Sequence, residues 1–77
     1  MISKEAIRKL RDELPRGSAP VIQKRLLEKG KVYHLNTINA TLDPDNTRFN
    51  PEIFDEAILY RDDLRREAMQ LEKKAMS

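Results

Sequence analysis

The sequence predicts a small all-α protein, a bundle of about four helices that contains a helix-turn-helix and has a long C-terminal helix. Apolar residues recur at spacings of three and four along most of its 77 residues, as on the buried side of a helix. Proline and glycine interrupt this pattern at residues 15–20, at Gly30 and at residues 43–51. No segment alternates apolar and polar residues as a strand would, and the β-prone pair Val32-Tyr33 is too short.

The first helix is expected to begin after Ser3, a residue that caps helix starts well. Ile7, Leu10 and Leu14 then form one apolar stripe, and Pro15 ends the helix at the residue before it.

The second helix follows the break and is expected to begin at Ser18 or Ala19, with Pro20 in its first turn and its end near Gly30. Its expected apolar face consists of Val21, Ile22, Leu26 and Leu27.

The third helix, expected at about residues 34–42, has an unusual composition. Leu35, Ile38 and Leu42 have helical spacing, but the residues between them are Asn, Thr, Asn, Ala and Thr. Asn and Thr are poor helix formers in solvent. Two amides and two hydroxyls on one exposed face therefore indicate a surface with a binding role.

The last helix is expected to begin at Pro51, with Asn50 as its cap, and to extend to about residue 74. At about 1.5 Å per residue it would be about 36 Å long, which exceeds the rest of the domain. Phe49 is expected in the core, where it would fix the preceding loop to this helix, and Tyr33 is also expected to be buried. The packed first part would contribute Ile53, Phe54, Ala57 and Ile58.

Two regions are expected, a helix-turn-helix domain at residues 1–60 and an extension of the last helix at residues 61–77. The extension has a thin apolar line with heptad spacing. It either makes a dimer contact that adds to another interface or remains a solvated tail. The dimer contact would consist of Leu64, Ala68 and Leu71, followed by Ala75.

Composition excludes several classes of protein. There is no cysteine and only one histidine, so no disulfide and no Cys- or His-based metal cluster is expected. No nucleophile has an evident base, so we expect neither an enzyme nor a cofactor. No apolar run approaches the roughly 20 residues that span a bilayer, and the N-terminus does not resemble a secretion signal. We expect a cytoplasmic protein.

The charge is unevenly distributed along the chain. Residues 1–31 contain nine Lys and Arg against four Asp and Glu, whereas residues 50–77 contain five against seven. The basic N-terminal half is either a set of solvated helix faces or a surface that meets phosphates.

Two helices joined by a turn, the second with short polar side chains, are the parts of a helix-turn-helix. In that motif the second helix lies in the DNA major groove, where Asn can bind adenine and Thr can contact the thymine methyl group. Short side chains suit a groove better than long Lys and Glu side chains do.

Residues 5–60 also resemble small helix-turn-helix proteins of bacteria and phages, which are similar to the DNA-binding domains of lambda-repressor-like and lactose-repressor-like regulators. The resemblance rests on Leu14-Pro15-Arg16-Gly17, on Ile38 with Leu42, and on Asn50-Pro51-Glu52-Ile53 with Ala57-Ile58. The connection between the two motif helices is about two residues longer than the usual short turn.

The resemblance implies double-stranded DNA as the partner and a set of contact residues. Base-reading positions, counted from Ile38, are His34, Asn36, Thr37, Asn39 and Ala40. Phosphate contacts are expected from Arg16, Ser18, Lys24, Lys31 and Arg48, with the first N–H groups of the second helix contributing at Ser18.

Three functions fit these observations. The first is sequence-specific DNA binding by a small transcriptional regulator that acts as a dimer. The second is the same fold used as a protein-interaction module through its last helix. The third is architectural DNA binding without sequence preference.

Overall fold

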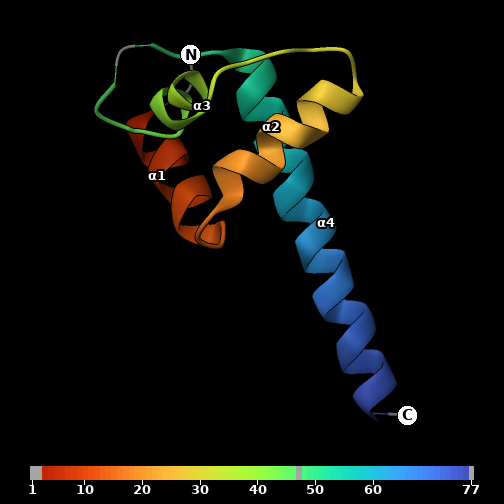
Figure 1. Cartoon of the computed structure of the whole chain (residues 1–77). Helices are drawn as coiled ribbons and strands as arrows, with labels where there is room; N and C mark the ends of the chain where they lie inside the picture. Colours follow the sequence, from red (N-terminus) through yellow and green to blue (C-terminus); the bar gives the residue numbers. More distant parts are fainter. Residues whose placement is uncertain (1–2, 47, 77) are drawn as a thin grey trace.

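The computed structural model describes residues 3–46 and 48–76. Four helices and no strand occur in this part of the chain: α1 (Lys4–Glu13), α2 (Ser18–Glu28), α3 (Leu35–Thr41) and α4 (Pro51–Met76). The first three helices gather around the first half of α4, and the second half of α4 projects away from them (Figure 1). The expected all-α fold with a long C-terminal helix is confirmed.

The helix starts follow the capping residues in the sequence. The Ser3 hydroxyl accepts a hydrogen bond from the N–H of Ala6 at 3.2 Å, and the Asn50 side chain accepts one from the N–H of Glu52 at 3.0 Å. These bonds satisfy N–H groups that have no partner within the helix. α2 differs because its N-cap is Gly17, which has a left-handed backbone with φ of 79° and no side chain to accept a bond.

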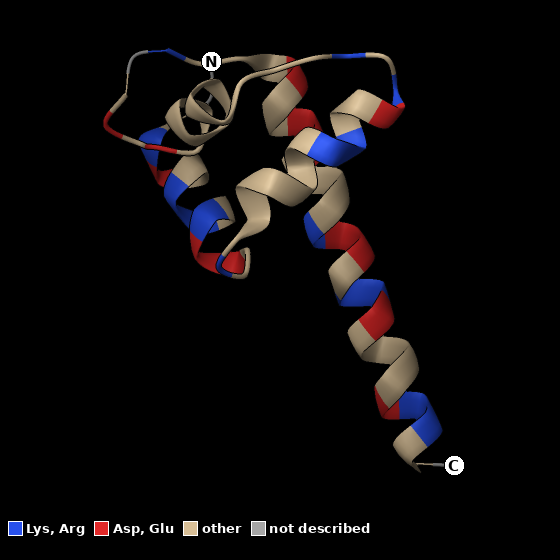
Figure 2. Cartoon of the chain, in the orientation of Figure 1, with Lys and Arg blue, Asp and Glu red and all other residues tan. Residues whose placement is uncertain are grey.

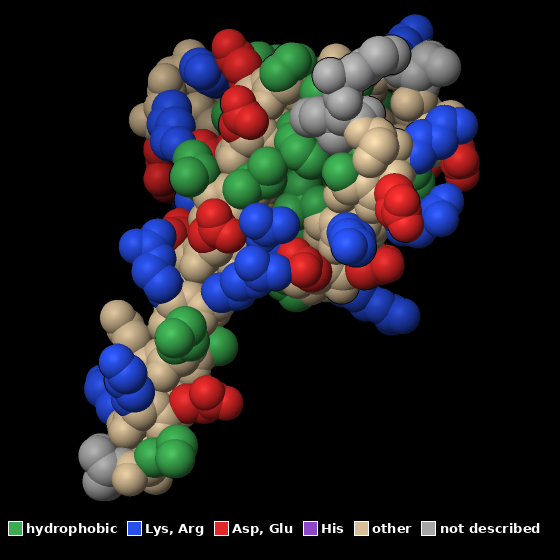
Figure 3. All heavy atoms as spheres, turned by 180° about the vertical axis from the view of Figure 1, so that it is seen from behind, with side chains coloured by type: hydrophobic (Ala, Val, Ile, Leu, Met, Phe, Trp, Pro, Cys, Tyr) green, Lys and Arg blue, Asp and Glu red, His purple; other side chains and the backbone are tan. Residues whose placement is uncertain are grey.

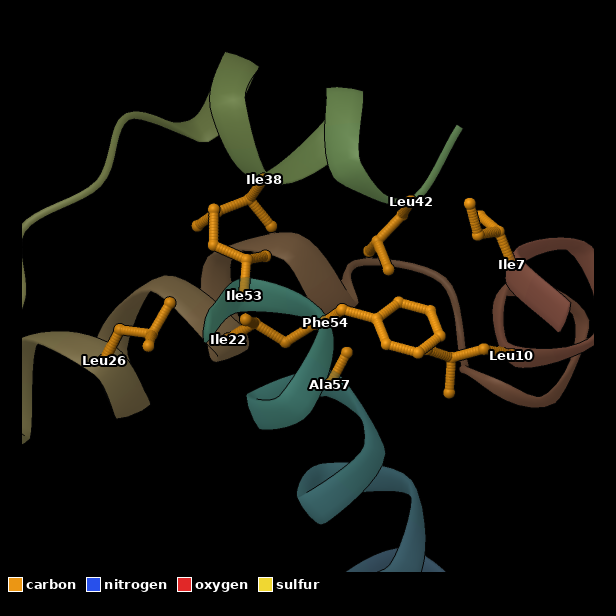
Figure 4. Packing of buried hydrophobic residues seen from close by; sticks show 9 residues of the cluster. All are labelled: Ile7, Leu10, Ile22, Leu26, Ile38, Leu42, Ile53, Phe54 and Ala57. Carbon is orange, nitrogen blue, oxygen red and sulfur yellow. The ribbon is translucent and has the colours of Figure 1, made fainter. Parts of the chain in front are cut away.

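The core consists of side chains from all four helices and from Leu42 at the end of α3 (Figure 4). α3 and α4 contribute Ile38 and Ile53, both with no exposed surface, and they face one another above Ile22 of α2. The nine buried hydrophobic residues are Ile7, Leu10, Ile22, Leu26, Ile38, Leu42, Ile53, Phe54 and Ala57.

The prediction that three further residues lie in the core is wrong, because their side chains are exposed. Val21 and Leu27 are 38% and 57% exposed, because α2 packs only along the line of Ile22 and Leu26 and they lie on either side of it. Phe49 is 36% exposed; its ring meets that of Phe54 at 5.3 Å and so covers the edge of the core instead of entering it.

An ionic cluster also joins α2 to α4. The Glu56 side chain is only 2% exposed and pairs with Lys29 and with Arg25, whose Nε lies 3.2 Å from Glu56 Oε2. Arg25 also reaches Asp63 at 2.9 Å, and its guanidinium lies 5.4 Å from the centre of the Tyr60 ring. Arg25 and Lys29, two basic residues of the N-terminal half, are therefore neutralised by carboxylates of α4.

Candidate nucleic-acid interface

The outward face of α3 presents short polar side chains. Ile38 and Thr41 are buried, whereas Asn36, Thr37 and Asn39 are exposed and Ala40 is half-buried. One of the two hydroxyls expected on the exposed face is not there, because Thr41 turns inward and donates a hydrogen bond to the carbonyl of Thr37 at 3.0 Å. Two amides and one hydroxyl remain available on this face.

His34 is the N-cap of α3. Its Nδ1 accepts a hydrogen bond from the N–H of Asn36 at 3.4 Å, and the side chain is exposed. The imidazole therefore supports the start of the helix, and Nε2 is the nitrogen that remains for a ligand.

The long connection before α3 is anchored on both sides. Gly30 and Lys31 donate backbone hydrogen bonds to the carbonyls of Leu27 and Leu26, each at 2.9 Å, which closes the end of α2. The Gln23 amide of α2 donates to the Tyr33 carbonyl at 2.9 Å. The extra residues of the connection thus run in a fixed course toward α3.

Tyr33 is half-buried and packs against the core, so its expected burial is only partial. Its hydroxyl donates to Glu52 Oε2 at 2.6 Å, and Lys31 Nζ lies 3.3 Å from the same oxygen. The hydrogen bond from Tyr33, with help from Lys31, lowers the pKa of Glu52 below its ordinary value. Tyr33 and Lys31 are both tied to the start of α4.

An open depression of about 610 Å³ lies between the α1–α2 turn and α3. Its lining includes Arg16 and the first turn of α2 on the side of the turn, Asn39 and Leu35 of α3, and Asp43 just after α3. The depression thus brings a predicted phosphate residue and a predicted base-reading residue to one surface.

The first turn of α2 lines this depression and has no side-chain cap. Gly17 provides no cap, so no cap hydrogen bond reaches the N–H groups of Ser18 and Ala19. The Ser18 hydroxyl is buried and donates to the Pro15 carbonyl. Only the backbone of Ser18, and not its side chain, is free to meet an anion.

The other predicted phosphate residues lie at different places. Within the described part of the chain, Arg16, Lys24 and Arg48 are exposed and make no ion pair, whereas Lys31 pairs with Glu52. Lys24 and Lys31 line a second, smaller hollow and not the depression, and Arg48 lies in the loop before α4.

α1 carries a basic stripe that was not among the predicted contact residues. Lys4, Arg8 and Arg11 are spaced by four and three residues, so they share one side of the helix. All three are exposed and without an ion pair among the described residues, and Arg11 lines the depression. Figure 2 shows how Lys and Arg recur along α1. Their spacing was visible in the sequence, but their lack of acidic partners was not.

The predicted dimer residues lie along α4, from its packed part into its projecting half. Leu64 is half-buried, whereas Ala68 and Leu71 are exposed on the projecting half. α4 continues without a break across residue 60, and its ion pairs with α1 reach Arg65, whose Nη2 lies 2.7 Å from Glu13 Oε1. The body of the molecule therefore extends slightly beyond the expected boundary.

Other kinds of site are not found in the described residues. No group of three or more His, Asp or Glu side chains is arranged there to hold a metal ion. Among residues 3–46 and 48–76, no helix combines the length and apolar character needed to cross a membrane. Comparisons with protein-family models, with curated proteins and with solved structures found no match to this chain.

Proposed function

We propose that the protein is a small transcriptional regulator that binds double-stranded DNA in a sequence-specific manner, with α2 and α3 acting as a helix-turn-helix and α3 lying in the major groove. The observation that carries this proposal is the depression shared by Arg16, the uncapped start of α2 and Asn39 of α3. A helix N-terminus and an arginine are phosphate-binding groups, and an amide reads base edges.

The side chains of α3 support this assignment. Asn36, Thr37 and Asn39 are short and exposed, so the backbone of α3 can approach the base edges closely. An Asn side chain can bind adenine through two hydrogen bonds, which is worth about 1–3 kcal/mol of discrimination against another base. His34 and Ala40, at the ends of this face, add a nitrogen and a methyl group.

The cations around the depression would provide affinity without sequence preference. Arg11 and Arg16 line it, and Arg8 and Lys4 extend the same side of α1. Each phosphate that a cation neutralises contributes about 0.9 to the slope of log K against log salt. Asp43 also lines the depression, and its negative charge opposes this attraction.

The test is selection of bound duplexes from a randomised DNA pool near physiological salt. We expect an enriched sequence, and we expect Asn39→Ala and Asn36→Ala each to reduce preference for it by about 1–3 kcal/mol. Arg16→Ala should weaken binding to selected and random duplexes alike. Gln70→Ala removes an exposed amide from the projecting half of α4 and serves as the control that leaves both affinities unchanged.

Equal losses on selected and random duplexes for both Asn variants would contradict base reading by α3. Binding that falls steeply with salt but enriches no sequence would instead support architectural DNA binding.

A second candidate function is protein interaction through α4. The observation that favours it is the projecting half of α4, where every residue from Arg65 to Met76 is exposed. Absence of DNA binding even at low salt would support this function over the first.

A further inference from the structure

The projecting half of α4 exposes apolar side chains along its length (Figure 3). Met69, Leu71 and Met76 are 61%, 67% and 87% exposed. A helix of about 12 residues is only marginally stable in water on its own account, and in proteins helices are stabilised chiefly by packing one face. The side of this half that contains Leu71 is covered by nothing in the described part of the chain, and Met69 and Met76 lie on nearly the opposite side of the helix.

The side that contains Leu71 continues the line by which α4 packs in the body. Ile53 and Ala57 are fully buried, and Leu64 is the next apolar residue on the same line, seven residues after Ala57. The line then proceeds through Ala68, Leu71 and Ala75 at spacings of four, three and four. We call these last four residues the α4 seam, from Leu64 to Ala75.

The order of residues in the α4 seam favours one direction of self-pairing. In a parallel pair each residue faces its own copy, so Leu–Leu layers would alternate with Ala–Ala layers and leave gaps at the alanines. In an antiparallel pair Leu64 faces Ala75 and Ala68 faces Leu71, so every layer combines one large and one small side chain. Facing large and small residues fill such an interface evenly.

The charges beside the α4 seam favour the same direction. Arg65 and Glu72 flank one side of it, and Glu67 and Lys74 flank the other. In the antiparallel register, residue 65 lies beside 72 of the second copy and residue 67 beside 74, so both contacts are attractive. In the parallel register Glu67 would lie beside Glu72 of the second copy, which is repulsive.

We propose that the α4 seam is a self-association surface on which a second copy of this chain binds antiparallel, with Leu64 opposite Ala75 and Ala68 opposite Leu71. The proposal rests on α4 alone and does not depend on DNA binding. The interface has only four layers, and each chain contributes an alanine to two of them, so the dimer is weak. Association is therefore measured at concentrations up to about 1 mM.

A charge reversal distinguishes the two directions. Glu67→Lys places a new ammonium group beside Lys74 of the second copy in the antiparallel pair but beside Glu72 in the parallel pair. By sedimentation equilibrium at low salt we expect the dimer Kd to rise roughly 5-fold in this variant and to recover in the double variant Glu67→Lys, Lys74→Glu. A lower or unchanged Kd for Glu67→Lys, or a wild-type protein that stays monomeric throughout, would overturn the proposal.

Disulfide formation tests the register directly, because the chain has no cysteine of its own. Leu64→Cys and Ala75→Cys proteins, one carrying a mass tag, are mixed in equal amounts and oxidised. We expect mixed disulfides in large excess, because two copies of residue 64 would be about 16 Å apart, well beyond the reach of a disulfide. Gln70→Cys, off the seam, gives the background of random collisions.

A second pair, Ala68→Cys with Leu71→Cys, repeats the test at two exposed positions whose substitution leaves the body unchanged. Disulfides formed mainly between like variants, or no more disulfide than in the Gln70→Cys protein, would overturn the antiparallel arrangement.

Discussion

Glu56 is a charged side chain in an almost fully buried position. Its carboxylate is 2% exposed, while its partners Arg25 and Lys29 keep 27% and 52% of their side-chain surface in solvent. Burial raises the pKa of Glu56, but the hydrogen bonds from Lys29 and Arg25 outweigh this effect, so the pKa lies below its ordinary value. Glu56 is therefore bound as an anion and contributes to stability in that form.

We predict that Glu56→Gln lowers the free energy of unfolding by about 1–3 kcal/mol at pH 7, because two charge-assisted hydrogen bonds lose their acceptor charge. A folded-state pKa below the ordinary value of about 4.3 gives stability that is present above that pH and is lost as the pH falls through the folded-state pKa. The difference between variant and wild type should thus shrink as the pH falls below about 4.3, which urea unfolding at pH 7 and at about pH 3 would measure.

Asp55→Asn removes a neighbouring exposed carboxylate that makes no ion pair among the described residues, and it serves as the control. A loss for Glu56→Gln that is equal at both pH values, or no larger than that of the control, would contradict the assigned role of the buried anion.

Single residues differ in how far the sequence predicts them. Ser3 and Asn50 were predictable as caps because their bonds reach only two or three residues along the chain. Thr41 and Phe49 were not, because the same polar or aromatic side chain can face either side of a surface until the neighbouring elements are placed. Ser18 was predicted to meet phosphate through the N–H groups at the start of α2, and this stays a prediction; the bond from its hydroxyl to the Pro15 carbonyl concerns the side chain only.

At the scale of elements, the turn between α1 and α2 depends on Gly17. Its φ of 79° is a left-handed conformation, and a Cβ placed there would meet nothing within 4 Å. We predict that Gly17→Ala lowers the free energy of unfolding by about 1 kcal/mol through backbone strain alone, measured by urea unfolding. Gly17→Asn should cost less, because Asn tolerates this conformation and its side chain can cap α2.

Equal costs for Ala and Asn at this position would show that something other than backbone conformation determines the effect. Gly17→Asn also introduces an acceptor for the N–H group of Ala19, so it should weaken DNA binding if that group meets a phosphate.

The four helices and their limits followed from local signals, since proline, glycine and capping residues act on their own neighbours. The sequence predicted less well which side of each helix is buried. α2 has four apolar residues within about two turns, and the sequence could not tell that α3 and α4 cover only Ile22 and Leu26. The base-reading and phosphate assignments remain predictions, although Arg16 and Asn39 do line one depression.

At the scale of the whole molecule, α4 is the helix through which the described residues form their ion pairs. Every ion pair recorded among the described residues includes a residue of α4, such as Glu52, Glu56 or Arg61. The basic character of the N-terminal half was therefore correctly seen in the sequence but is partly balanced by α4. The cations left without partners in the described part of the chain lie on α1, on the α1–α2 turn and at Lys24, Arg48 and Lys73.

The body should fold without the projecting half of α4. We predict that removal of residues 67–77 changes the free energy of unfolding by less than about 0.5 kcal/mol, because the removed side chains that the structure describes are exposed. The far-ultraviolet circular dichroism signal should fall in proportion to the helix removed. Urea unfolding at low micromolar concentration, where a weak dimer dissociates, is the measurement, and a loss of several kcal/mol would contradict this division of the chain.

α4 has neither glycine nor proline after Pro51, so the body and the α4 seam are joined by one stiff helix. At about 1.5 Å per residue, Ala57 lies about 19 Å from the midpoint of the seam, and two antiparallel copies would hold their Ala57 residues about 38 Å apart. One turn of DNA separates adjacent half-sites by about 34–36 Å. If the proposed dimer binds DNA as proposed, the number of residues in α4 would thus set the spacing between the two sequences that its two copies contact.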